Sequence, residues 1–285
     1  MPDSTRWISV GELAQAFAPD NNTPRATGDL AGRTFQLYLE NGQTVEHHFV
    51  TGTELHWTVK QGSGQDRQAD ETYRATKVRE GIYFVDFVRH LEQATTVTLV
   101  LDLTHNLADH GIVTVLIARL PEEAQVQRSL ADRLAAGDEL TPVKAVVMSG
   151  AVDAPFTAET PRHRPTTELV GRRVEYTYSP TERYEHIYLN DQFYTWHCLQ
   201  GSEKGLADTD RCHYFKIDDD LYLFVWREKI VPTLGAVLVD FDLMRTVGKI
   251  FGYESGDYAN AANFPVGAHA RLLNVTRREE VPIAQ

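Results

Sequence analysis

The sequence has little of what would mark a disulfide scaffold, a membrane protein or a nucleic-acid-binding protein. Its only two cysteines, Cys198 and Cys212, have a spacing that fits neither a CxxC motif nor another common metal-ligand pattern. No stretch approaches the length of a transmembrane helix, and no apolar signal core follows Met1. The formal net charge is −12, whereas nucleic acids and anionic membranes bind basic patches. These absences predict a cytoplasmic protein with reduced cysteines and with no nucleic-acid or membrane partner.

The most informative feature that is present is an internal repeat of one whole domain. A shift of 139 residues aligns residues 30–87 with residues 169–226 without a gap and gives 11 identities in 58 pairs. Average residue usage would give about three or four identities. The repeated motifs are Leu-x-Gly-Arg at 30–33 and 169–172, Glu-His at 46–47 and 185–186, and Gln-Gly-Ser at 61–63 and 200–202. We therefore predict two copies of one domain, residues 1–159 and 160–285, in agreement with the chain length.

Both halves consist of short runs of alternating apolar and polar residues separated by turn residues. The first run, Phe35 to Leu39, ends at Asn41-Gly42, which is a strong hairpin signal. Seven or eight such runs in order predict an all-β fold class, with an up-and-down antiparallel barrel in each half. The expected strands are 35–39, 45–50, 54–59, 75–78, 82–88, 96–101, 112–118 and 143–148, then 173–178, 184–189, 193–199, 214–217, 221–226, 235–241 and 246–251.

Two segments are predicted to be helices. Trp7 to Phe17 is amphipathic, and Ser9 with Glu12 three residues later is typical of a helix N-terminus. Between the halves, the segment 121–136 begins with a proline, carries two glutamates in its first turn and is followed by Gly137. We therefore expect a short N-terminal helix and one inter-barrel helix over residues 121–136.

The second half places two phenols and a carboxylic acid on strand faces that can share a barrel interior. Tyr176 and Tyr178 lie on one face of their strand, because side chains alternate along a strand. On a later strand, an aromatic stripe at alternate positions from Tyr222 to Trp226 ends in Glu228. Two phenols and an acid among aromatic rings would suit proton transfer, and burial would raise the pKa of the acid. The alternative is that the two tyrosines are amphipathic barrel residues with their hydroxyls at the rim.

The first half lacks this combination of side chains. Leu37 and Leu39 stand where the second half has its two tyrosines, and Arg89 stands where the second half has Glu228. We therefore expect the site, and the larger polar cavity, in the second barrel. The first barrel is expected to be filled or lined by Leu37 and Leu39.

The histidines and the repeated Glu-His pair do not indicate a metal site or a catalytic dyad. Within Glu46-His47 and Glu185-His186, the neighbouring side chains point to opposite faces of a strand and cannot share one barrel interior. None of the histidines shows a strand pair at i and i+2 or an HExxH spacing. The Gln-Gly-Ser turns lack the lysine and following helix of a phosphate-binding loop. We expect no metal and no cofactor.

Three segments of the second half resemble the bacterial phenolic acid decarboxylases, which are small lipocalin-like barrels. The segments are RRVEYTY at 172–178, ERYEHIYLND at 182–191 and LYLFVWREK at 221–229. The whole chain, including APDNNTP at 18–24 and the two-copy layout, is more similar still to the MoaF family. That family carries a molybdenum-cofactor-biosynthesis label by name and is sometimes linked to monoamine-utilisation operons. The resemblance implies two tandem lipocalin-like barrels.

The decarboxylase resemblance also implies roles for particular residues. Tyr176 and Tyr178 would bind a substrate carboxylate, and Glu228 would be the acid that handles the proton. Around them we expect a substrate-binding wall that includes Tyr184, Trp196, Tyr222, Phe224 and Trp226. The chain departs from the family at 205–207, where Gly-Leu-Ala replaces Gly-Arg-Trp. Lys204 and Arg211 are the candidates to replace the missing cation.

Two functions from different classes follow. The first is a cofactor-independent enzyme, lyase- or decarboxylase-like or else an isomerase or hydratase, acting on a small aromatic or phenolic compound in the second barrel. The second is a non-catalytic lipocalin-type binding protein linked to molybdenum cofactor biosynthesis or monoamine metabolism. In either case the expected partner is a small aromatic ligand, and a homodimer is possible.

Overall fold

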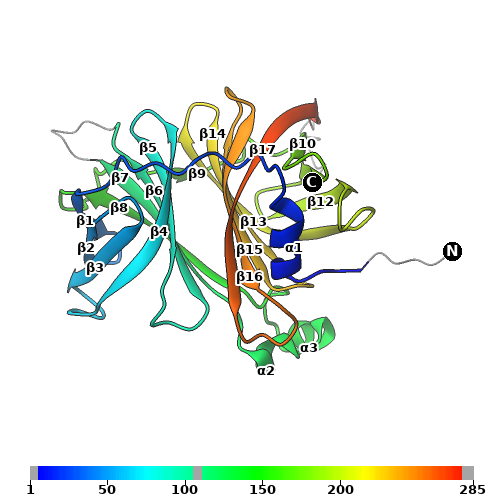
Figure 1. Cartoon of the computed structure of the whole chain (residues 1–285), viewed down its shortest axis with the longest axis horizontal. Helices are drawn as coiled ribbons and strands as arrows, with labels where there is room; N and C mark the ends of the chain where they lie inside the picture. The colour runs from blue at the N-terminus through cyan, green and yellow to red at the C-terminus, as the bar shows by residue number, and fades with distance from the viewer. Residues whose placement is uncertain (1–5, 105–110, 278–285) are drawn as a thin grey trace, which may run out of the picture.

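Two antiparallel β-barrels lie side by side in the computed structural model, which describes residues 6–104 and 111–277 (Figure 1). Strands β1–β8 form the first barrel and strands β10–β17 form the second. The predicted all-β fold, with one barrel in each half of the chain, is therefore confirmed.

The first barrel closes because β1 pairs with both β2 and β8. Along β1 and β3, alternate residues are buried, as the alternating sequence pattern predicts. The strands are β1 (Thr34–Leu39), β2 (Thr44–Phe49), β3 (Glu54–Gln61), β4 (Gln68–Arg79), β5 (Ile82–Val88), β6 (Thr95–Asp102), β7 (Ile112–Arg119) and β8 (Lys144–Val152).

The second barrel closes through the pairing of β12 with β13, and the short β9 adds to β13 from outside the ring. Strand β17 was not expected from the sequence, because it contains Pro265 and its burial does not alternate. The strands are β9 (Arg164–Pro165), β10 (Arg172–Thr177), β11 (Arg183–Tyr188), β12 (Phe193–Gln200), β13 (Ala207–Asp218), β14 (Leu221–Glu228), β15 (Thr233–Asp240), β16 (Arg245–Tyr253) and β17 (Ala261–Val275).

The sequence repeat is visible in the strand boundaries. A shift of 139 residues carries β2, β3 and β4 onto β11, β12 and β13 with the same first and last positions. The repeated Glu-His pair behaves as expected in the first copy, where His47 faces the barrel interior and Glu46 faces outward to Lys60. The two copies are therefore comparable residue by residue from β2 to β5.

Helix α1 (Val10–Phe17) begins with the predicted capping box, in which Ser9 and Glu12 satisfy each other's backbone amides. Although the helix precedes the first barrel in the chain, it packs against β16 and β17 of the second (Figure 1). Its apolar face, with Val10 and Phe17, joins the aromatic core of that barrel. The N-terminal segment therefore crosses over and covers one end of the second barrel.

The single helix expected over residues 121–136 is instead two short ones, α2 (Glu123–Val126) and α3 (Leu130–Ala135). The division follows from Ser129, whose hydroxyl accepts a hydrogen bond from the amide of Asp132 and so caps a new helix. Asp132 completes a capping box with Ser129. A second start signal inside the segment therefore overrides its continuous helical pattern.

The barrels pack through the outer faces of their sheets. One apolar cluster joins residues of β5, β6 and β7, such as Phe84 and Leu116, to residues of β14, β15 and β16, such as Leu223 and Phe251. Polar contacts accompany it, and Arg79 forms an ion pair with the buried Asp240 across the boundary. The contact between the halves is therefore a continuous core rather than a flexible link.

Candidate functional site

The predicted tyrosines point into the second barrel and not to its rim. Tyr176 is 1% exposed and Tyr178 is 4% exposed. The Tyr176 hydroxyl lies 2.7 Å from the hydroxyl of Tyr188, so these two buried phenols satisfy each other. Both tyrosines thus lie in the interior, but among the described residues only the Tyr176 hydroxyl has a hydrogen-bond partner.

Inside the second barrel, two phenol hydroxyls lack a hydrogen-bond partner among the residues that the structure describes. They belong to Tyr178 and to Tyr194, a β12 residue that the sequence reasoning missed. Burial is the main cause of the raised pKa of Tyr178, and the charges of Tyr176 and Glu228 add to it. Burial followed by the Glu228 charge likewise raises the pKa of Tyr194. Both phenols are therefore near Glu228 and hold their protons at neutral pH.

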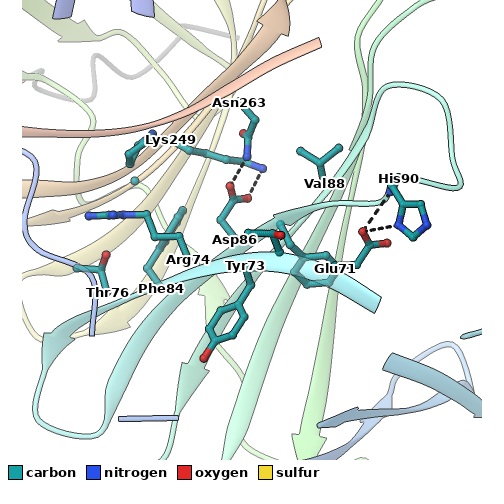
Figure 2. Close-up of a pocket in the computed structure, with 14 residues that line it drawn as sticks. Glu71, Tyr73, Arg74, Thr76, Phe84, Asp86, Val88, His90, Lys249 and Asn263 are labelled. Atoms are coloured by element: carbon teal, nitrogen blue, oxygen red, sulfur yellow. Dashed lines mark hydrogen bonds and ion pairs between the residues drawn. The ribbon is translucent and has the colours of Figure 1, made fainter. Parts of the chain in front are cut away.

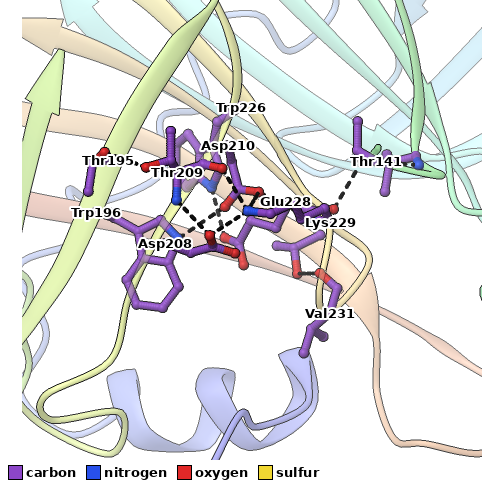
Figure 3. A network of polar contacts seen from close by, with 12 residues as sticks. Thr141, Thr195, Trp196, Asp208, Thr209, Asp210, Trp226, Glu228, Lys229 and Val231 are labelled. Atoms are coloured by element: carbon purple, nitrogen blue, oxygen red, sulfur yellow. Dashed lines mark hydrogen bonds and ion pairs between the residues drawn. The ribbon is translucent and has the colours of Figure 1, made fainter. Parts of the chain in front are cut away.

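The Glu228 carboxyl group stands at the end of β14, as the stripe predicts, in a network of polar side chains (Figure 3). The Trp226 indole donates a hydrogen bond of 2.9 Å to Glu228 Oε1. Burial of the carboxyl group raises its pKa well above the ordinary value, and the nearby Asp210 and Glu203 raise it further. This carboxyl group can therefore keep a proton under conditions in which an exposed glutamate has lost it.

Next to Glu228 lies an ion-pair cluster that the sequence reasoning missed. The Lys229 ammonium contacts the carboxylates of Asp208 and Asp210, and the Trp196 indole donates to Asp210 over 3.2 Å (Figure 3). Asp210 is only 2% exposed, and burial raises the pKa of its carboxyl group. The alignment of the copies contains a signal for this cluster, because Asp210 matches another acid, Glu71.

Glu203, another carboxyl group with a raised pKa, lies at the end of the barrel that α1 covers. The hydroxyl of Tyr184 donates to Glu203 over 3.1 Å, and the backbone of Ile8, just before α1, also hydrogen-bonds to it. Burial raises the pKa of Glu203 to about 7. The ring of Trp7 meets the ring of Trp196 edge-on at 5.4 Å. The predicted wall residues Tyr184 and Trp196 thus face the helix as well as the barrel interior.

The remaining predicted wall residues are distributed along β14. Trp226 stacks on Phe224 with ring centroids 5.1 Å apart, and Phe224 is fully buried. The Tyr222 hydroxyl donates to Glu168 over 2.6 Å. Glu228 is six positions after Tyr222, and each position advances the strand by about 3.3 Å, so the two side chains lie at opposite ends of β14. The structure does not bring Tyr222 to the carboxyl group.

Neither candidate for a replacement cation reaches this region. Lys204 is exposed in a turn, and Arg211 packs its guanidinium over the outward-facing ring of Phe193. The cation beside Glu228 is Lys229, and it is already paired with two aspartates. The surroundings of Glu228 therefore lack a free cation in the described part of the chain.

The first barrel has the same tryptophan–acid pair as this region but a different residue at the position of Glu228. The Trp57 indole donates to Glu71 over 3.5 Å, as Trp196 does to Asp210. His90 occupies the position of Lys229 and bonds to Glu71 (Figure 2). Arg89 occupies the position of Glu228. Because the surrounding pairs are shared, this exchange of charge is the main difference between the two interiors.

The prediction of the larger polar cavity in the second barrel is not supported by the cavities that the structure shows. A cavity of about 220 Å³ lies inside the first barrel, where Leu37 and Leu39 line it as expected but Arg89 and His47 also do. The second barrel has aromatic rings in these places, and Phe17 of α1 packs on Tyr178 with ring centroids 4.8 Å apart. Large aromatic side chains occupy space that leucines leave open.

Another hollow, of about 420 Å³, lies between the barrels (Figure 2). At its wall the buried Lys249 bonds to Asp86, and Asn263 donates to the same carboxylate over 2.6 Å. Since each of these groups is paired across the barrel boundary, the arrangement is that of an interface.

The described residues contain no group of three or more His, Cys, Asp or Glu side chains placed to hold a metal ion. Cys198 and Cys212 are both buried and free. Within the same residues, no helix is long and apolar enough to cross a membrane.

Comparison with known proteins gives a full-length match. The model of the MoaF N-terminal domain matches residues 5–122, and the model of the MoaF C-terminal domain matches residues 163–276. The chain is 42% identical over 283 residues to Protein MoaF of Klebsiella aerogenes, covering 98% of this chain and 100% of that protein. A solved structure described as a putative beta-lactamase from Burkholderia vietnamiensis aligns with 40% of this chain and all of its own, at 15% identity and a TM-score of 0.32.

Proposed function

Because the chain belongs to the MoaF family, whose models cover both barrels, we propose a function for the barrel in which the two copies differ in chemistry. The second barrel is a cofactor-independent acid–base site for a small aromatic compound. Glu228 exchanges the proton, and Tyr178 positions the ligand. The observation that carries this proposal is a half-buried, protonatable carboxyl group close to two phenols whose hydroxyls have no partner among the described residues.

The aromatic surroundings favour an aromatic ligand. Tyr194, Phe224 and Trp226 lie within 6.0 Å of one another by ring centroid. Aromatic pairs in such arrangements contribute about 0.5–1.5 kcal/mol beyond the area that they bury. A planar ring entering among these side chains would gain the same contacts.

The local charge favours a neutral or cationic ligand over an aromatic acid. The two carboxylates of Asp208 and Asp210 share the single cation Lys229, and Glu203 is close enough to raise the pKa of Glu228. A substrate carboxylate would therefore meet like charges and find no free cation near Glu228. We infer that aromatic aldehydes, or compounds derived from aromatic amines, suit the site better than para-hydroxycinnamates.

The proposed chemistry follows from the state of each group. With its raised pKa, Glu228 holds a proton that it can donate to a ligand atom and then take back, as a general acid–base does. The Trp226 indole holds the carboxyl group in place through Oε1, so Oε2 is left to face the ligand. The Tyr178 hydroxyl donates a hydrogen bond to a ligand oxygen, which fixes the position of the ring.

The test is a substrate screen followed by conservative variants. The first substrates are para-hydroxylated aromatic aldehydes, amines and acids. On any substrate found, Glu228→Gln should lower kcat by about 10²–10⁴ while affinity changes little, because the variant retains the volume but loses proton exchange. Tyr178→Phe should weaken binding and turnover together. Retention of full activity by Glu228→Gln would refute the proposed role.

Tyr176→Phe is the matched control for Tyr178→Phe, because each variant removes one ring hydroxyl from the same strand face. The Tyr176 hydroxyl bonds only to Tyr188. We therefore expect Tyr176→Phe to affect turnover much less than Tyr178→Phe. Equal losses would return Tyr176 to the catalytic role that the decarboxylase resemblance implies.

A binding protein without turnover is the second candidate. The observation that favours it is the dense packing of the interior, in which Phe17 and Trp7 of the N-terminal segment lie against Tyr178 and Trp196. Binding of an aromatic ligand with no product under any condition, and with the same affinity in Glu228→Gln, would favour this function over the enzyme.

A further inference from the structure

We infer that the first barrel is a separate binding site for a small monocarboxylate, with Arg89 as its anchor. The site is the cavity of about 220 Å³ inside that barrel. Drug-sized ligands occupy pockets of about 300–1,000 Å³, so this cavity suits a smaller molecule. The inference does not depend on the chemistry proposed for the second barrel.

The guanidinium of Arg89 is placed to hold a carboxylate. It lies over the Trp57 ring at 4.8 Å from the centroid, and its Nη1 donates to Glu92 over 3.0 Å. Its Nε is buried without a partner, and its Nη2 has no hydrogen bond to any described residue. These two donors form the edge of an arginine that binds a carboxylate through two parallel hydrogen bonds.

The charge of the cavity lining also favours an anion. The lining includes Arg67 and Arg89 but no aspartate or glutamate. Both guanidinium groups share the single carboxylate of Glu92, which leaves one positive charge unbalanced. His47 adds no charge, because burial lowers its pKa to about 4. The first barrel is therefore cationic at the position where the second barrel has Glu228.

The rest of the lining indicates a ligand with a compact apolar body. Leu37, Val45, Leu99 and Val115 surround the space opposite Arg89. Access is from the end at which the exposed Ser63, Gly64 and Arg67 lie. In the second barrel, Gly64 corresponds to Glu203, which the N-terminal segment covers. The described residues place no such helix over the first barrel.

Titration calorimetry of the full chain with benzoate at pH 7 tests the site. Benzamide is the matched neutral probe, and benzylamine is the cationic one. We expect benzoate to bind more tightly than both. Arg89→Gln should weaken benzoate binding by about 10- to 100-fold, which is the effect expected for lost charge-assisted hydrogen bonds. Arg211→Gln should bind benzoate like the wild type, because that guanidinium lies on the outside of the other barrel.

A second variant keeps the test decisive if Arg89→Gln unfolds the chain. Leu39→Phe adds volume to the lining while Arg89 remains, so it should abolish benzoate binding by occupying the cavity. No benzoate binding by the wild type at millimolar concentration would overturn the inference. So would undiminished binding in Leu39→Phe, or a loss caused by Arg211→Gln but not by Arg89→Gln.

Discussion

At the scale of single residues, the two barrels differ by the exchange of a cation for a protonatable carboxyl group within a shared set of contacts. Each interior keeps a tryptophan that donates to an acid, Trp57 to Glu71 and Trp196 to Asp210. Beside this pair, the first copy has Arg89 and the second has Glu228. Both groups are half-buried and lie beside an indole ring, Arg89 over Trp57 and Glu228 hydrogen-bonded to Trp226.

Glu203 should make the stability of the protein depend on pH. Its pKa is about 7 in the folded chain and about 4.5 when exposed, so the folded state binds more protons between these values. The contribution of Glu203 to the free energy of unfolding should therefore fall as pH rises from about 4.5 to about 7 and then stay level. At about 1.4 kcal/mol for each pKa unit, the loss is on the order of 3 kcal/mol.

Glu203→Gln is the control for this pH effect. The amide can still accept the hydrogen bond from Tyr184 but cannot ionise, so the decline should become smaller by the contribution of Glu203, and the variant should be the more stable protein at pH 8. The raised pKa values of Glu228 and Asp210 should leave a decline of their own. Urea unfolding at pH 5, 6, 7 and 8 measures both chains. A decline of the same size in Glu203→Gln would show that other groups cause it.

Gly235 leaves the space in which the Trp226 ring lies. A Cβ at this position would be 2.0 Å from Cζ2 of the indole. Gly235→Ala should therefore displace the indole that donates to Glu228 and destabilise the fold by about 1–3 kcal/mol. Near-ultraviolet circular dichroism and urea unfolding report the two effects. Gly256→Ala, at an exposed position with nothing near its Cβ, should leave both signals unchanged.

At the scale of elements, α1 depends on a contact that its own sequence does not reveal. A Cβ on Gly11 would lie 2.2 Å from the carbonyl oxygen of Glu254. Gly11→Ala should raise helix propensity by about 1 kcal/mol but push α1 off the barrel. We expect easier acrylamide quenching of tryptophan fluorescence and faster proteolysis within residues 6–17.

Gln15→Ala is the matched change on the exposed face of the same helix. It improves helix propensity without touching the barrel, so quenching and proteolysis should stay at wild-type levels. If Gly11→Ala behaved in the same way, the contact with Glu254 would not determine how α1 docks.

The sequence predicted those elements whose signals are local. The capping box at Ser9 and the turn at Asn41-Gly42 depend on neighbouring residues, and both are present. The destination of α1 could not be predicted, because its partners lie more than 150 residues away. Strand β17 was missed since Pro265 and weak alternation hide a segment that is stabilised by pairing on both sides.

The candidate site was predicted in part for the same reason. Alternation along a strand correctly placed Tyr178 and Glu228 toward one interior, and comparison of the copies identified Arg89 as the contrasting residue. The partners of these residues come from other strands. Asp210 of β13 and Tyr194 of β12 become neighbours of Glu228 only through strand pairing and barrel closure, which periodicity does not describe.

At the scale of the whole molecule, a buried ion pair fixes one barrel to the other. Lys249 is 1% exposed and bonds to Asp86, which also accepts from Asn263. Asp86→Ala should destabilise the protein by about 3–5 kcal/mol, because it leaves a buried ammonium with the Thr96 hydroxyl but without a counter-charge. The double variant Asp86→Ala/Lys249→Met should recover most of this loss. Urea unfolding would contradict the idea if the double variant were no more stable than Asp86→Ala.

Because α1 docks on the second barrel, it cannot reach its final position until most of the chain has been translated. Phe17 packs against Phe264, and 247 residues separate them in the chain. At about 5–20 residues per second, a ribosome needs roughly 12–50 s to make the intervening segment. The first barrel can form during that time, whereas the apolar face of α1 has no packing partner until β16 and β17 have been synthesised. Helix α1 is therefore the first element to be synthesised and one of the last to dock.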